Sequence, residues 1–229
     1  SDVYKRQDIG LGNIHIALRN KLNGNLVDVL EGKKEIQDIL IESETGISII
    51  SGGNGLDESL ALNSENTSNI IRAFAALENQ FDIMIVDISA GANQSVLSFL
   101  SACHHQIVIG TNEPSSVADA YALIKLIHLT LGLSNIIFIP NKVSTKREGS
   151  VLFEKMNTIT AKFLGVALTF IGSISESSDY SLAWNKGKAA VSIGESTTCY
   201  HDFAAIVDEL DKVAMSRKSD GIQFFNSTK

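Results

Sequence analysis

Hydrophobic and polar positions alternate along the chain in two kinds of segment. Short runs rich in Ile, Val and Phe predict buried strands, and stretches with apolar residues at helical spacing predict amphipathic helices. Strands are predicted over residues 46–51, 81–88, 106–111, 135–142 and 168–173. Helices are predicted over residues 14–18, 25–32, 35–41, 67–77, 94–102, 114–132, 150–163, 179–184 and 198–213. This alternation predicts an α/β fold with a mostly parallel sheet and helices on both faces.

The segment 81–92 carries the clearest chemical signal. Four apolar residues, Ile83 to Val86, precede Asp87, and the small residues 89–92 follow. One interpretation is a buried strand whose terminal carboxylate holds Mg²⁺ through water, while Gly91 donates its N–H to a phosphate oxygen. The other is an ordinary strand end with an N-capping Asp, and the segment alone does not choose between them.

Other polar residues follow predicted strands or lie where a strand is expected to end. The carboxyl ends of parallel strands open onto one crevice, where such sheets bind ligands. For a nucleoside triphosphate, Asp8 could orient the attacking water, Asp87 could hold the magnesium shell and Asn141 could bond the purine edge. Asp8 and Asn141 are also common turn residues, and that alternative stays open. The candidate positions are Asp8 with Gly10, Asp87 with Gly91, Asn112–Glu113, and Asn141.

Composition narrows the classes of protein. The 229 residues are 44% hydrophobic and 20% charged, which favours one globular α/β domain. The formal net charge of -7 argues against a broad nucleic-acid-binding surface, so direct DNA binding is not expected. Cys103 and Cys199 are far apart and fit no metal-ligand spacing, which argues against a Cys-x-x-Cys iron–sulfur carrier and favours a reducing cytoplasm.

The chain contains no glycine-rich phosphate loop, since neither Gly-x-Gly-x-x-Gly nor Gly-x-x-x-x-Gly-Lys-[Ser/Thr] occurs. Other segments nevertheless resemble the MinD/ParA class of deviant-P-loop ATPases and, within it, the flagellar-number regulators of the FlhG/FleN branch. The resemblance runs from Asp8 to about Val213. The segments are Asp8–Asn13, Asn25–Gly32, Asp38–Glu42 with Gly46–Ile50, Phe81–Gly91, Asn112–Ser116 with Asp119–Lys125, and Asn141–Val143.

The resemblance implies a P-loop NTPase fold and gives the candidate residues roles. Asp8, in the turn with Gly10, matches the switch I Asp that positions the hydrolytic water. Asp87 matches the Walker B Asp that holds Mg²⁺ through water, Gly91 the switch II glycine, and Asn141 the adenine-reading Asn. The implied cofactors are ATP and Mg²⁺. The implied partners are a second copy of the chain in an ATP-dependent homodimer, an FlhF-like GTPase and, in some bacteria, a flagellar transcription activator.

The chain also departs from the family pattern. The family's first strand, phosphate loop and following helix have no counterpart, so residues 1–7 are expected to be a non-family lead and residues 8–213 an incomplete ATPase domain. This predicts unpaired neighbouring strands and little or no ATP binding or hydrolysis by these residues alone. Ile174–Ser177 and Ala190–Val191 replace the family's Ile-Pro-x-Asp and Pro-Val, which predicts a looser loop beside the adenine.

Three functions agree with these patterns. The first is an ATP-switched regulator of flagellar placement and number, and the second is a non-catalytic module that binds partners without ATP turnover. The third is a ParA- or MinD-type partitioning or cell-division-site ATPase, which the acidic charge makes less attractive. In the tail, residues 214–229, the apolar Gly221–Phe225 could begin an amphipathic helix that holds a cytoplasmic protein on the inner membrane, or could be a frayed terminus.

Overall fold

The computed structural model describes residues 21–43, 46–53, 64–78, 80–88, 94–214 and 222–224. The chain divides into two compact units, one from residues 1–103 and 219–229 and one from residues 104–218. Each unit has a hydrophobic core of its own. The expectations for Asp8, Gly10, Gly91 and the helix at 14–18 lie outside the described residues.

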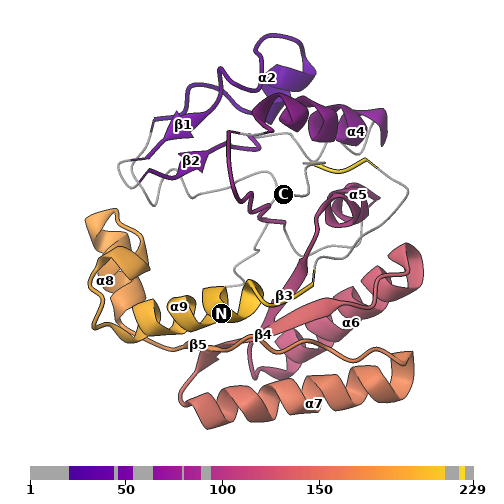
Figure 1. The fold of residues 1–229 in the computed structure, drawn as a ribbon, viewed down its shortest axis with the longest axis vertical. Coiled ribbons are helices and arrows are strands. Elements are labelled where there is room, and N and C mark those ends of the chain that lie inside the picture. Colours follow the sequence, from indigo (N-terminus) through magenta and orange to yellow (C-terminus); the bar gives the residue numbers. More distant parts are fainter. Residues whose placement is uncertain are drawn as a thin grey trace, which may run out of the picture. The chain divides into compact units, whose positions relative to one another are not determined.

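The first unit combines short helices with a small antiparallel pair of strands (Figure 1). The predicted helix at 25–32 is confirmed as α2, because Asn25 and Asp28 form a reciprocal capping box and Gly32 follows the helix with a φ of 68°. The elements of this unit are α2 (Leu26–Leu30), β1 (Ile41–Glu42), β2 (Ser48–Ile49), α4 (Ser64–Ala73), the 3₁₀ helix η1 (Phe74–Leu77) and α5 (Gln94–Ala102).

Two helix predictions in this unit are wrong in part. Residues 35–41 form a turn that leads into β1, because the Asp38 side chain accepts the Glu35 N–H at 3.0 Å and competes with helical hydrogen bonding. Helix α4 begins at Ser64, so Thr67, which was expected near the start of the helix, lies inside it and is only 2% exposed. The predicted helix at 94–102 is confirmed as α5.

The segment 81–88 is extended but is not a strand. Met84 and Val86 pack on the core of the first unit, whereas Ile83 and Ile85 are 73% and 89% exposed. An extended backbone forms a strand only by hydrogen bonding to a neighbour, and the described residues provide no such pairing for it. The prediction of a strand buried on both faces is therefore wrong here: one face is covered and the other is bare.

Phe224 in the C-terminal tail belongs to the core of the first unit. Its side chain is 4% exposed, lies parallel to the Phe99 ring with centroids 6.0 Å apart, and meets Phe74 edge-on at 5.2 Å. The Phe224 N–H also donates to the Ala102 carbonyl at 3.4 Å. The tail therefore contributes an aromatic anchor to the packing of α5 and η1.

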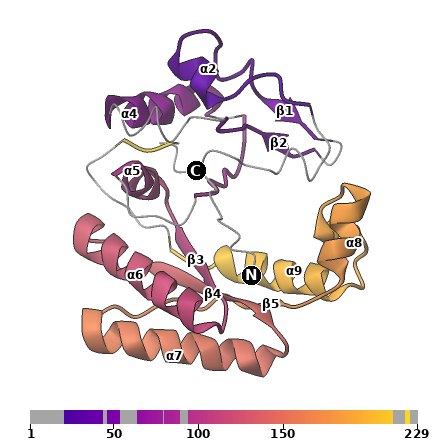
Figure 2. The same ribbon diagram turned by 180° about the vertical axis from the view of Figure 1, so that it is seen from behind.

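The second unit is built on a parallel sheet in the order β3-β4-β5. Helices α6 and α7 lie on one face of this sheet and α9 lies on the other (Figures 1 and 2). This arrangement confirms the predicted α/β class with helices on both faces. The elements are β3 (Gln106–Gly110), α6 (Pro114–Leu131), β4 (Ile136–Val143), α7 (Lys146–Leu164), β5 (Ile174–Ser175), α8 (Asp179–Lys186), the 3₁₀ helix η2 (Ala190–Ser192) and α9 (Thr198–Leu210).

Some boundaries in this unit differ from the predictions. Helix α7 begins at Lys146 instead of near residue 150, because Thr145 caps its first turn. The predicted strand at 168–173 makes a single bridge to β4 through Thr169, and Gly172, with a φ of 138°, interrupts it before β5. Strand β5 is therefore shorter and later than the sequence predicts.

Strand β3 was predicted to be buried but is buried on one face only. Val108 is 4% exposed, whereas Ile107 and Ile109 are 41% and 54% exposed. These two residues lie in register with Ile137 and Ile139 of β4, on the face where α9 packs against β5. Among the described residues, β3 is an edge strand with no partner on its other side.

The bare face of the segment 81–88 predicts an unequal response to substitution. Ile85→Ala is expected to change the free energy of unfolding by about 0.5 kcal/mol or less, because the side chain is almost fully exposed. The matched control Ile39→Ala removes a side chain that is 0% exposed and is expected to cost about 2–5 kcal/mol. Urea denaturation measures both, and equal costs would show that residues 81–88 are buried as a strand after all.

Candidate functional site

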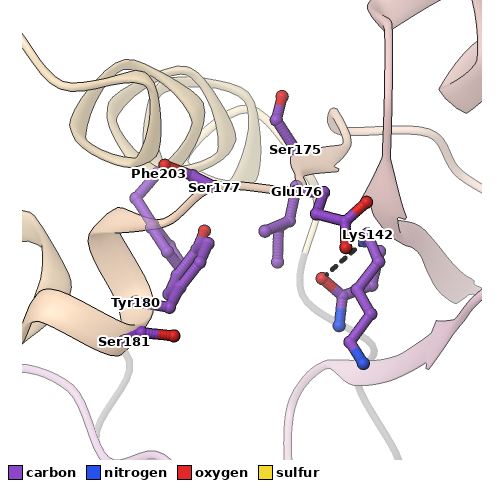
Figure 3. A pocket seen from close by; sticks show the side chains of 9 residues that line it. Lys142, Ser175, Glu176, Ser177, Tyr180, Ser181 and Phe203 are labelled. Carbon is purple, nitrogen blue, oxygen red and sulfur yellow. Dashed lines mark hydrogen bonds between the residues drawn. The ribbon is translucent and has the colours of Figure 1, made fainter. Parts of the chain in front are cut away.

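A pocket of about 400 Å³ opens at the carboxyl ends of β4 and β5. Its volume lies in the range of small-molecule sites, and its position is where open α/β sheets bind ligands. Residues from β4, β5, α8 and α9 surround it (Figure 3). The lining residues are Asn141, Lys142, Ile174, Ser175, Glu176, Ser177, Tyr180, Ser181 and Phe203.

Asn141, predicted as a candidate, lines this pocket. Strand β4 continues through it to Val143, and the pairing with β5 shifts register between Asn141 and Val143, so Lys142 is a bulged residue with a φ of 55°. Bulges of this kind redirect side chains and are common beside functional sites. The Asn141 Oδ1 accepts the Lys142 N–H at 2.9 Å, and its Nδ2 makes no hydrogen bond to another described residue.

The pocket has an aromatic side and a polar side. Tyr180 and Phe203 lie together on one side, and Lys142 and Glu176 lie on the other (Figure 3). The described residues of the lining include one cation and one anion together with aromatic rings, hydroxyls and an amide. Such a wall suits a flat, neutral, heteroaromatic group that can stack on a ring and exchange hydrogen bonds with an amide.

Asp202 of α9 fixes the start of the loop after β5 by a hydrogen bond. This carboxylate is 1% exposed, accepts the Ser175 N–H at 2.7 Å and forms an ion pair with Lys146 at the start of α7. Three elements, α7, β5 and α9, therefore meet at one buried carboxylate. The sequence predicts a looser loop at 174–177, but its first polar residue is held by a charge-assisted hydrogen bond.

Two opposing effects act on the pKa of Asp202. Burial is the largest influence and by itself raises the pKa, but hydrogen bonds from Lys146 and Ser175 and the charge of Lys146 together outweigh it. The net pKa is below the usual value of 3.8, so Asp202 is ionised at neutral pH. The charge of Asp202 is thus part of the folded loop.

Of the polar residues after β3, Asn112 contacts the first turn of α7. Asn112 Nδ2 donates to Glu148 Oε1 at 3.4 Å, and Glu148 Oε2 accepts the Ser144 N–H at 2.8 Å. Glu113 is exposed and precedes α6 without a side-chain cap. Of the polar strand ends in this unit that the sequence marked, only Asn141 therefore lines the pocket.

Asp87 lies in the first unit and Asn141 in the second. Asp87 is exposed at the end of the extended segment 81–88. Mg²⁺ keeps several waters and commonly uses one or two protein carboxylates together with phosphate oxygens, so a single exposed Asp fits a water-mediated role. Among the described residues, no group of three His, Cys, Asp or Glu side chains could hold a metal by itself. The described part of the chain also has no helix long and apolar enough to cross a membrane.

Sequence reasoning missed the contributions of α8 and α9 to this site. Cys199, Asp202, Phe203 and Ile206 recur at helical spacing, and Cys199, Asp202 and Ile206 are buried. The sequence did carry a signal for Asp202, because it is an Asp on an otherwise apolar helix face and a buried carboxylate needs partners. Tyr180 had no comparable signal, since its place in the pocket depends on the packing of α8.

Comparisons with known proteins agree with this architecture. The chain is 30% identical over 219 residues to the antiactivator FleN of Pseudomonas aeruginosa, covering 95% of this chain and 78% of FleN. It is 26% identical over 172 residues to the flagellum site-determining protein YlxH of Helicobacter pylori, covering 75% of this chain and 58% of YlxH. No family profile matches the chain.

Solved structures share the fold. The cell division ATPase MinD of Pyrococcus furiosus matches with a TM-score of 0.70 at 17% identity, over 90% of this chain and 84% of that one. MinD of Pyrococcus horikoshii, solved with Mg-ADP, matches with a TM-score of 0.69 at 18% identity, over 90% of this chain and 81% of that one. The chain belongs to the MinD/ParA class of P-loop ATPases. Within this class, the similarity to FleN places it with the flagellar regulators.

The Asp202 contact predicts a measurable dependence of stability on pH. Asp202→Ala is expected to lower the free energy of unfolding at pH 7 by about 1–3 kcal/mol, because the Ser175 N–H loses its acceptor. Lys146, 63% exposed, returns to water at little cost. Since the folded pKa is depressed, the contribution of the carboxylate is present above pH 3.8 and is lost as the pH falls through the folded pKa.

Urea denaturation of wild type and Asp202→Ala across pH measures this contribution. Their difference is expected to be constant near neutral pH and to shrink below about pH 3.8. The control Asp202→Asn keeps an acceptor for the Ser175 N–H and is expected to lose less stability than the Ala variant at pH 7. A difference that persists unchanged at low pH would contradict the ionised contact.

Proposed function

We propose that this protein is a FleN-type nucleotide switch that limits the number and placement of bacterial flagella. The observation that carries the proposal is the pocket at Asn141, whose position and chemistry suit the base of ATP. The similarity to FleN and to YlxH, named as an antiactivator and a flagellum site-determining protein, supports the flagellar role. Counting flagella in cells without the protein tests this role, and an unchanged number and position would contradict it.

The base end of the nucleotide fits the second unit. Asn141 has an uncommitted amide N–H₂ and an oxygen with one lone pair in use, so it can donate to a ring nitrogen and accept from an amino group. Phe203 and Tyr180 supply aromatic surface on the other side of the pocket. The described residues that line the pocket include one cation, Lys142, and one anion, Glu176, and this balance favours a base over a phosphate.

The phosphate end of the proposal rests on residues that the sequence marked. Asp87 would hold Mg²⁺ through water, and a bound Mg²⁺ neutralises phosphate charge. Asp8 would orient the hydrolytic water, with Gly10 in the same turn, and Gly91 would donate its N–H to a phosphate oxygen. Hydrolysis would end an ATP-dependent homodimer, and the dimer would contact an FlhF-like GTPase or a flagellar transcription activator.

A non-catalytic partner-binding module is the second candidate function. These 229 residues contain no glycine-rich phosphate loop with its lysine, so by themselves they suit a module that binds partners. Without such a loop, these residues lack the main source of charge neutralisation for a triphosphate. A partitioning or division-site ATPase of the ParA or MinD type is a further alternative, supported by the similarity in fold to MinD.

The 229-residue chain is expected to distinguish poorly between adenosine and ATP. Binding should come from the base pocket, so the two dissociation constants are expected to agree within about tenfold, and Asn141→Ala is expected to weaken both by about tenfold. Calorimetric titration of each ligand measures this. The control Asn112→Ala removes an amide that lies outside the pocket and is expected to change neither affinity.

Three results of this titration would contradict specific parts of the proposal. ATP binding at micromolar affinity, far tighter than adenosine, would show that these residues do form a phosphate site. If neither ligand binds, the proposed base pocket is wrong. Equal weakening by Asn112→Ala and Asn141→Ala would mean that the effect is not local to the pocket.

Attachment to the inner-membrane surface through residues 214–229 is a further part of the proposal. Membrane attachment has a free-energy cost, because the buried Phe224 ring would have to leave its contacts with Phe74 and Phe99 before it could enter lipid. Flotation with anionic vesicles is expected to recover more of the full chain than of a variant lacking residues 221–229, with circular dichroism confirming that both are folded. Equal recovery of the full chain and the shortened variant would contradict membrane attachment through these residues.

A further inference from the structure

The backbone of Lys142 has an unusual conformation in the wall of the pocket. Its φ of 55° lies in the left-handed region, and no other non-glycine residue in the described part of the chain has a positive φ. A lysine in this region is strained, because its Cβ comes close to the carbonyl oxygen that follows it. Strained residues persist only where the surrounding structure holds them, and they cluster at functional sites.

The strained residue coincides with a change of face in β4. In a regular strand alternate residues share a face, so Ile139, Asn141 and Val143 would all lie on the side that α9 covers. Ile139 does belong to the core on that side. Val143 instead lies beside Gly149 of α7, on the opposite side of the sheet (Figure 2), and is 1% exposed. Lys142 is the extra residue that makes this change possible.

The same conformation fixes the side chain of Asn141. The Lys142 N–H donates to Asn141 Oδ1 at 2.9 Å, which holds the amide oxygen against the backbone. Asn141 Nδ2 is accessible to solvent and makes no hydrogen bond to another described residue. Asn141 therefore offers a ligand two N–H donors and the remaining lone pair of Oδ1.

We propose that Lys142 is a positioning residue whose left-handed backbone sets the Asn141 amide so that Nδ2 donates a hydrogen bond to a ring nitrogen of the bound base. This inference rests on the proposed function, which places the base in the Asn141 pocket. The Lys142 ammonium is not required for this role, because the backbone makes the contact. Asn tolerates the left-handed conformation better than most residues, whereas a β-branched Val is a severe outlier there.

The matched variants Lys142→Asn and Lys142→Val separate the backbone from the side chain. Both remove the ammonium, but only Asn keeps the left-handed conformation at little cost. Calorimetric titration of the 229-residue chain with adenosine is expected to give an affinity within about twofold of wild type for Lys142→Asn, and an affinity about tenfold weaker for Lys142→Val. Circular dichroism and urea denaturation show whether each variant is folded during the titration.

A double-mutant cycle measures the positioning itself. Asn141→Ala is expected to weaken adenosine binding about tenfold in wild type but less than about twofold in Lys142→Val, because the amide of that variant no longer faces the base. A purely structural role of Lys142 would give the same factor in both backgrounds and would contradict the proposal.

The variant Asn141→Asp tests the orientation of the amide with Lys142 unchanged. It keeps an oxygen for the Lys142 N–H but has no Nδ2 donor, so it is expected to bind adenosine as weakly as Asn141→Ala does. This measurement does not depend on the folding of Lys142→Val. Wild-type affinity of Asn141→Asp would overturn the inference.

The outcomes distinguish this inference from the proposed function. If wild type binds adenosine and Asn141→Ala weakens binding, but Lys142→Asn and Lys142→Val bind it equally well, the role of Lys142 is overturned while the base pocket stands. If wild type binds no adenosine, the base pocket itself is wrong, and the inference is overturned with it.

Discussion

Strand β4 is paired on both sides in the second unit, with β3 in parallel register from Gln106 opposite Ile136 to Gly110 opposite Pro140, and with β5 beyond Asn141. This double pairing brings the carboxyl ends of the strands to one edge, where polar side chains can meet a ligand. The register shift at Lys142 then places Asn141 in the wall of a pocket. Fold and site in this unit therefore depend on the same strand.

A buried charge outside the pocket lining holds one of the lining residues, Ser175. Asp202 holds Ser175 and Lys146, and through them fixes the loop after β5 between α7 and α9. A buried carboxylate is stable only when its partners are in place, so the loop and the two helices adopt their positions together. Helix α9 also carries Phe203 and Cys199, a neighbour of Tyr180, which links the stability of the loop to the shape of the proposed base site.

In the first unit, the apolar segment 81–88 resembles the strands of the second unit in sequence but forms no strand. Ile83 and Ile85 alternate with Met84 and Val86, but only the latter pair contacts the core that Phe224 helps to fill. The alternation is that of a strand with one covered face, and Asp87 follows on the exposed side. A carboxylate in this position is open to water, as a water-mediated role toward Mg²⁺ requires.

The sequence by itself determined the features that depend on neighbours along the chain. Capping residues and terminal glycines located α2 and α6 well, and the alternation of strands and helices determined the class of fold, because these signals act over a few residues. Only the tertiary structure decided which apolar segments have an exposed face, as at Ile85 and Ile109, since burial depends on what packs against them. It also decided that Tyr180 lines the pocket with Asn141 and that Asp202 holds Ser175 in its wall, because partners distant in sequence leave no local pattern.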